Sequence, residues 1–272
     1  MTADTAFAEH LRDVAVTAAR EAAQWLREAR PVGRVMVEAT KSSPTDPVTA
    51  FDTAVQDKLQ RRLTAMRPDD GYLGEEGLEE PGSSGVVWVL DPIDGTVNFM
   101  YGVPAFAVSV AAQVDGVSLA GCVVEVTSGE EFAAARAAGA TLRPSADRPA
   151  MPLQLPPAPA LNLALVATGF NYDLDTRRRQ AASVGILLSE VRDIRRFGAA
   201  SLDLCAVAAG RVGAYVERGL NRWDVAAGGL VAQEAGAVLA GIDAEPLGQR
   251  LVLATSPGLL EPLQDLVERS AF

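Results

Sequence analysis

The sequence predicts a layered protein of mixed α and β structure. Helix-like and strand-like patterns alternate along its 272 residues. Apolar residues at helical spacing predict long amphipathic helices, and short continuous apolar runs such as VVWVL at 86–90 predict buried strands. Hydrophobic residues make up 49% of the chain and charged residues 22%, which is usual for folded proteins and excludes disorder as the main state.

Two helices are expected near the N-terminus. Apolar residues recur at helical spacing from Phe7 to Ala29, and Pro31 ends this pattern. A loop containing Lys41 follows, and a second helix is expected around 55–66, before Pro68.

Strands are expected next, after the acidic, turn-rich segment 69–85. The strand 86–90 is expected to end at Asp91-Pro92. The strand-like runs 106–110 and 117–126 flank Asp115-Gly116, a dipeptide typical of hairpin turns.

A proline-rich connection divides the chain into two halves that form one functional unit. Six prolines lie between Arg143 and Ala160, which predicts an extended connection between an N-terminal half (1–145) and a C-terminal half (160–272). The elements expected in the second half alternate: strand 163–168, helices 176–190 and 199–209, strand 213–217, helix 224–235, strand 251–254 and a helix after Pro257.

The composition excludes several classes of function. A net charge of −11 argues against a nucleic-acid or membrane-surface binder, because both need a positive face. A single histidine, His10, leaves no histidine triad or multi-histidine metal site. Two isolated cysteines and an N-terminus unlike a signal peptide fit the reducing cytoplasm.

The motif DPIDGT at 91–96 is the strongest chemical signal. Asp91 and Asp94 flank the Ile93 carbonyl at the end of a buried strand, and such hard oxygen atoms suit Mg²⁺. Gly95 allows close approach of the backbone, and the following amides can bind a phosphate if a helix begins there. The alternative is that the two aspartates only stabilise a turn.

Two further acidic positions have the same ambiguity. Glu75 lies in GEEG, where the glycines let the backbone bend to aim a carboxylate, although the loop could simply be solvated. Asp224 follows Trp223 at the expected start of a helix, where it could be an N-cap, a metal ligand or both.

These motifs together resemble the inositol monophosphatase family, within the lithium-sensitive, magnesium-dependent phosphatase superfamily. The resemblance rests on Lys41 with SSPTDPVTAFD, then GEEG, DPIDGTVNF, RRFGAASLDLCAVAAGR and WDVAAGG, in the family's order and approximate spacing along nearly the whole chain. It implies a five-layered αβαβα sandwich and a homodimer. One departure is Tyr101, near a place where many relatives carry a histidine.

The resemblance also implies a role for each matching residue. The Mg²⁺ ligands would be Glu75, Asp91, the Ile93 carbonyl, Asp94 and Asp224. The substrate would contact Asp94, Gly95, Thr96, Ala200, Glu217 and Asp224. Apart from the resemblance, Arg195 is a further candidate for substrate binding, although Arg195 and Arg196 could instead face a partner subunit. Supporting positions behind the metals would be Lys41, Thr49 and Asp52.

The expected activity is hydrolysis of a small polyol phosphate monoester, most simply inositol 1-phosphate. Four carboxylates in one pocket would repel one another and the substrate, so two or three Mg²⁺ ions are needed. A metal-bound water would attack in line, with Glu75, Thr96 and Asp94 as the catalytic residues. Histidinol phosphate, fructose 1,6-bisphosphate and a nucleotide bisphosphate remain alternative substrates, and a non-catalytic regulatory or binding role remains an alternative of another class.

Overall fold

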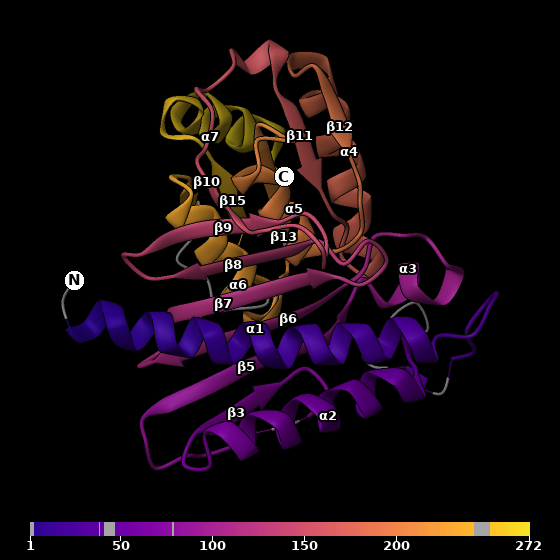
Figure 1. Cartoon of the computed structure of the whole chain (residues 1–272). Helices are drawn as coiled ribbons and strands as arrows, with labels where there is room; N and C mark the ends of the chain where they lie inside the picture. The colour runs from indigo at the N-terminus through magenta and orange to yellow at the C-terminus, as the bar shows by residue number, and fades with distance from the viewer. Residues whose placement is uncertain (1–2, 38, 41–46, 78, 242–250) are drawn as a thin grey trace.

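The chain folds into five alternating layers of helices and sheets. The computed structural model describes residues 3–37, 39–40, 47–77, 79–241 and 251–272. From one side to the other, the layers are α1 with α2, an eight-stranded sheet, α5 with α6, a five-stranded sheet, and α4 with α7 (Figure 1). The mixed fold and the αβαβα sandwich expected from the sequence are confirmed.

The large sheet is built almost entirely from the N-terminal half. Its strand order is β10-β9-β8-β7-β6-β5-β3-β4, and all neighbours are antiparallel except β3 and β5. The strands are β3 (Gly71–Gly74), β4 (Glu79–Glu80), β5 (Val86–Asp94), β6 (Ala107–Val114), β7 (Val117–Glu125), β8 (Glu131–Ala135), β9 (Gly139–Arg143) and β10 (Met151–Leu153). A separate short pair is formed by β1 (Ala39–Thr40) and β2 (Pro47–Val48).

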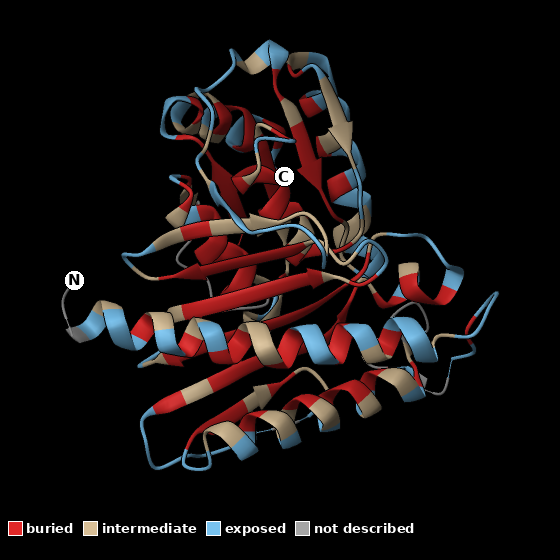
Figure 2. Ribbon diagram, viewed as in Figure 1, coloured by how far each residue is buried: buried red, intermediate tan, exposed pale blue. Residues whose placement is uncertain are grey.

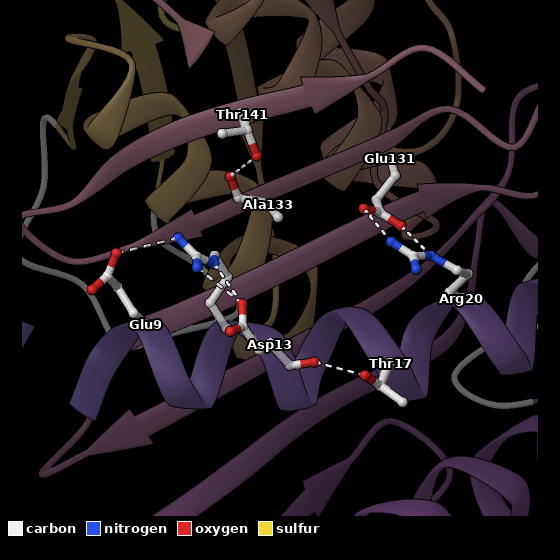
Figure 3. A network of polar contacts seen from close by, with 8 residues as sticks. Glu9, Asp13, Thr17, Arg20, Glu131, Ala133 and Thr141 are labelled. Carbon is white, nitrogen blue, oxygen red and sulfur yellow. Dashed lines mark hydrogen bonds and ion pairs between the residues drawn. The ribbon is translucent and has the colours of Figure 1, made fainter. Parts of the chain in front are cut away.

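Helices α1 (Ala3–Ala29) and α2 (Ala50–Met66) cover the outer face of the large sheet. The inward side of α1 is apolar and its other side is exposed, as the alternating colours in Figure 2 show. Burying Leu11 and Leu26 between helix and sheet removes apolar surface from water, which is the main stabilising contribution. Arg20 adds a bidentate ion pair with Glu131 on β8, with N–O distances of 2.8 and 2.9 Å (Figure 3).

The small sheet belongs to the C-terminal half and has the order β12-β11-β13-β15-β14. Its strands are β11 (Leu165–Thr168), β12 (Asp193–Arg195), β13 (Ala214–Arg218), β14 (Val238–Ala240) and β15 (Leu251–Thr255). The helices are α3 (Thr96–Tyr101), which leaves the large sheet, then α4 (Leu174–Glu190), α5 (Ala200–Ala208), α6 (Arg222–Glu234), α7 (Leu260–Ser270) and the 3₁₀ turns Leu161–Leu163 and Pro257–Leu259.

The central layer, α5 and α6, is buried between the two sheets. The two helices pack against each other, and α6 also packs directly on β6, β7 and β8. Small residues allow this approach: a Cβ added at Gly121 of β7 would lie 2.9 Å from the Ala227 Cα on α6. The C-terminal half therefore packs on the N-terminal sheet through its helices, and the two halves share one core.

Two sequence expectations differ from the structure. Strand β5 continues through Pro92 to Asp94 instead of ending at Asp91, because a β-bulge absorbs the proline. The connection between the halves is only partly extended coil: β10 lies within it and pairs with β9 at the edge of the large sheet. Pro152 can occupy this strand because an edge strand has one unpaired side. The remaining predicted helices and strands are present, with boundaries that move by a few residues.

No helix within the described ranges is both long and apolar enough to cross a membrane.

The close contact between β7 and α6 predicts a sensitive position. Gly121→Ala forces a methyl group against the Ala227 backbone, so we expect a loss of about 1–3 kcal/mol in the free energy of unfolding. The control is Gly185→Ala in α4, where an added Cβ meets nothing within 4 Å and should stabilise the helix by about 0.5–1 kcal/mol. Denaturant titration measures both, and equal effects of the two substitutions would contradict the packing argument.

Candidate functional site

The site begins at the end of β5, where a β-bulge brings two aspartates to one side. In regular strand, residues three apart point to opposite faces. Here Asp91 pairs with Ser109 and Asp94 pairs with Ala107. Between these two pairs the chain advances by three residues on β5 but by only two on β6. The extra residue turns Asp94 to the side of Asp91.

Glu75 reaches the same place from the neighbouring parallel strand. Its amide donates to the Leu90 carbonyl at 3.1 Å, which continues the β3–β5 pairing beyond Gly74. Gln56 of α2 fixes the following turn, because its side-chain amide accepts from the Glu76 amide at 3.1 Å and donates to the Glu76 carbonyl at 3.4 Å.

Asp224 joins the cluster from the first turn of α6, in the C-terminal half. It accepts a 2.6 Å hydrogen bond from the Asn221 amide and so takes part in a capping box. One carboxylate oxygen from each of Asp91, Asp94 and Asp224 lies within 4.8 Å of the others. The cluster therefore forms only when the halves pack together.

Helix α5 orients Asp94 through three donors, which the sequence analysis did not identify. The carboxylate accepts from the Ala200 amide at 3.2 Å, the Ser201 amide at 2.7 Å and the Ser201 hydroxyl at 2.5 Å. The sequence signal was a serine in the first turn of a predicted helix, where side-chain donors are common but their target is unknown.

The electrostatics of this cluster favour a bound cation. Burial raises the pKa of Asp91 well above its ordinary value, and the charges of Glu75, Asp94 and Asp224 raise it further. Burial also raises the pKa of Asp224, and the charges of Glu75 and Asp94 raise it further. Asp91 Oδ1 is buried without a hydrogen-bond partner among the described residues, and such atoms usually have one. An all-oxygen donor set with one unsatisfied oxygen suits a hard divalent cation such as Mg²⁺.

Thr96 stands beside the cluster at the start of α3. The preceding Gly95 has a left-handed backbone with φ of 86°, which glycine adopts without strain. The Thr96 hydroxyl lies 3.0 Å from the Ile93 carbonyl and 3.4 Å from Asp52 Oδ1. Asp52 also accepts from the Thr49 amide and hydroxyl at 2.7 and 2.6 Å, so the start of α2 supports this edge of the site.

A pocket of about 120 Å³ opens over these residues. Most of the residues predicted to bind metal or substrate line it: Glu75, Asp91, Ile93, Asp94, Gly95, Thr96, Ala200, Glu217 and Asp224. Asp52 links Thr49 to Thr96 by hydrogen bonds, and the supporting role of Thr49 and Asp52 stays a prediction. Lys41 lies outside the described residues.

The prediction for Arg195 needs correction. Arg195 donates to Asp193 at 2.6 Å and is not among the pocket-lining residues, whereas the next residue, Arg196, is. Arg195 is the last residue of β12 and Arg196 is the first residue after it, so the two side chains leave the strand end differently. Tyr101, the noted departure, is exposed and its ring lies under the Arg34 guanidinium.

The comparisons with known proteins agree with this geometry. The sequence profile of the inositol monophosphatase family matches residues 8–270. The chain is 46% identical to an inositol-1-monophosphatase of Mycobacterium leprae (strain TN), covering 96% of this chain and 94% of that protein. It is 36% identical to a Nus factor SuhB of Pasteurella multocida (strain Pm70), covering 79% and 82%. The solved structure of Mycobacterium tuberculosis SuhB superposes with a TM-score of 0.82 at 42% identity, covering 96% of this chain and 97% of that one.

The raised pKa values predict how stability depends on pH when no metal is bound. A carboxyl group whose pKa is raised by folding contributes its full stability below about pH 4 and loses it as the pH rises through the folded-state pKa. In EDTA, the unfolding temperature of Asp91→Asn should therefore fall less between pH 5 and pH 8 than that of the wild type. The control is Asp57→Asn, at an exposed position of α2. If the unfolding temperatures of Asp91→Asn and wild type depend on pH in the same way, the raised pKa assigned to Asp91 is wrong.

Proposed function

The chain belongs to the inositol monophosphatase family, and on that premise we propose that it is a magnesium-dependent phosphatase of small polyol phosphates, with inositol 1-phosphate as the first candidate. The proposal depends on one observation: the carboxylates of Asp91, Asp94 and Asp224 lie close together, and the buried Oδ1 of Asp91 has no hydrogen-bond partner among the described residues. Bound divalent cations would neutralise the charge of these carboxylates more fully than the arginines that line the pocket.

The ligands of these cations would be Glu75, Asp91, the Ile93 carbonyl, Asp94 and Asp224. When bound, Mg²⁺ would neutralise the carboxylates, lower the pKa of coordinated water and stabilise the negative charge of the leaving oxygen. Two carboxylates about 4 Å apart repel by about 4 kcal/mol at an effective dielectric constant near 20, so a phosphate dianion would not enter the bare cluster.

The chain's own residues would then position the reactants. The Thr96 hydroxyl would orient the attacking water by a hydrogen bond, and the Glu75 carboxylate would accept the proton of that water, because both line the pocket at the cluster. Gly95 and Thr96 would hold the phosphate, with Asp52 and Thr49 fixing the Thr96 hydroxyl. Ala200 and Glu217 would face the alcohol. In phosphoryl transfer, such positioning and electrostatics supply most of the rate enhancement.

A second function is favoured by the names of some relatives. Several proteins about as similar as the Pasteurella multocida one are named Nus factor SuhB, so a non-catalytic regulatory role is the alternative. Phosphate release with and without Mg²⁺ from inositol 1-phosphate, histidinol phosphate and fructose 1,6-bisphosphate separates the two. If no ester is hydrolysed, the regulatory role is favoured and the proposed activity is rejected.

Asp94→Asn should abolish turnover while leaving the fold intact. The amide keeps the size of the side chain but removes a charge from the cation cluster, so we expect at least about a hundredfold loss in kcat. Phosphate release measures activity, and circular dichroism confirms folding. Asp57→Asn is the matched control on the surface of α2. Near-normal, Mg²⁺-dependent phosphate release by Asp94→Asn would refute the assignment.

Three further properties are part of the proposal. We expect inhibition by lithium, which titration of the same assay measures. We expect a homodimer, which light scattering of the purified protein measures. A cytoplasmic location is consistent with Cys122 and Cys205, which are both buried and unpaired.

A further inference from the structure

Glu217 and Arg196 form a wall of the pocket that carries opposite charges. Glu217 comes from β13, and its Oε2 accepts a 2.6 Å hydrogen bond from the Tyr215 hydroxyl. The carboxylate occupies the space above Gly169, since a Cβ added there would overlap both of its oxygens. The absence of a side chain at Gly169 therefore allows Glu217 to lie in this wall.

A second glycine leaves room for Arg196 at the same wall. Its guanidinium lies over Gly198, where an added Cβ would collide with Arg196 Nη1. The other arginine of the pocket, Arg218, donates to the Phe272 carbonyl at 3.1 and 3.3 Å. Arg196 is exposed and has no hydrogen-bond or ion-pair partner among the described residues, so its guanidinium is available to a ligand.

The two carboxyl groups near Arg196 are buried, which opposes their negative charge. Burial raises the pKa of Glu217 to about 7, although the Tyr215 hydroxyl and Arg196 lower it. Burial also raises the pKa of the nearby Asp203 well above its usual value, with Glu217 adding to the effect and Arg196 opposing it. Burial therefore opposes the ionisation of both carboxyl groups beside the Arg196 guanidinium.

We propose that Arg196 selects the alcohol part of the substrate by its charge. An anionic or uncharged alcohol fits opposite the guanidinium, and a cationic alcohol is disfavoured. This inference rests on the proposed phosphatase function and narrows it, because Glu217 alone does not distinguish a polyol from an ammonium group. Arg196 would thus rank fructose 1,6-bisphosphate and inositol 1-phosphate above histidinol phosphate.

The test compares three esters whose alcohol parts differ in charge. For Arg196→Ala, we expect KM for fructose 1,6-bisphosphate to rise about tenfold, because a hydrogen bond to a charged group is lost. KM for inositol 1-phosphate should change less than about threefold, and histidinol phosphate should be hydrolysed at least as well as by wild type. Arg196→Lys keeps the charge and should restore most of the preference.

The matched control is Arg192→Ala, which removes the same charge at an exposed position outside this pocket and should leave the ranking unchanged. An equal change for all three esters in Arg196→Ala would overturn the inference, because it would indicate general attraction of the phosphate. If the wild type hydrolyses none of them, the proposed function fails separately. The inference is then tested by the rise in unfolding temperature that fructose 1,6-bisphosphate causes in the presence of Mg²⁺, which should be larger for wild type than for Arg196→Ala. Equal stabilisation would overturn it.

Discussion

Repulsion between carboxylates is the constraint on which the site depends. Burial raises the pKa of Asp91, Asp94 and Asp224, and the charges of neighbouring carboxylates raise it further at Asp91 and Asp224. The fold opposes this with directed donors: α5 supplies two amides and the Ser201 hydroxyl to Asp94, and the capping box of α6 holds Asp224. The fold thus keeps three carboxylates close together, where a divalent cation could neutralise them.

The central helical layer links the core to this chemistry. Helices α5 and α6 are buried between the sheets, and the N-terminal ends of both point to the carboxylates. The positive end of a helix dipole stabilises nearby negative charge. A change in packing at Gly121 and Ala227 would therefore move Asp224 as well as lower stability. The two halves therefore share one hydrophobic core although their strands belong to different sheets.

The pocket combines a cluster of carboxylates with a wall that carries an arginine and a glutamate. The carboxylate cluster, together with its cations, would hold the phosphate, which every candidate substrate shares. In our proposal, the wall of Arg196 and Glu217 would face the alcohol, which differs from one substrate to another. Because Arg196 is exposed, its replacement should alter preference without disturbing the buried cluster.

The sequence by itself determined the mixed fold, most of its helices and strands, and the acidic residues of the site, because periodicity and the DPIDGT and WD motifs are local signals. Tertiary structure alone decided how those acids meet. The bulge that aligns Asp91 with Asp94 depends on pairing with β6, and the Ser201 contact joins residues more than a hundred positions apart. Which of Arg195 and Arg196 faces the pocket depends on how β12 lies against its neighbours, and no pattern in RRFG shows this.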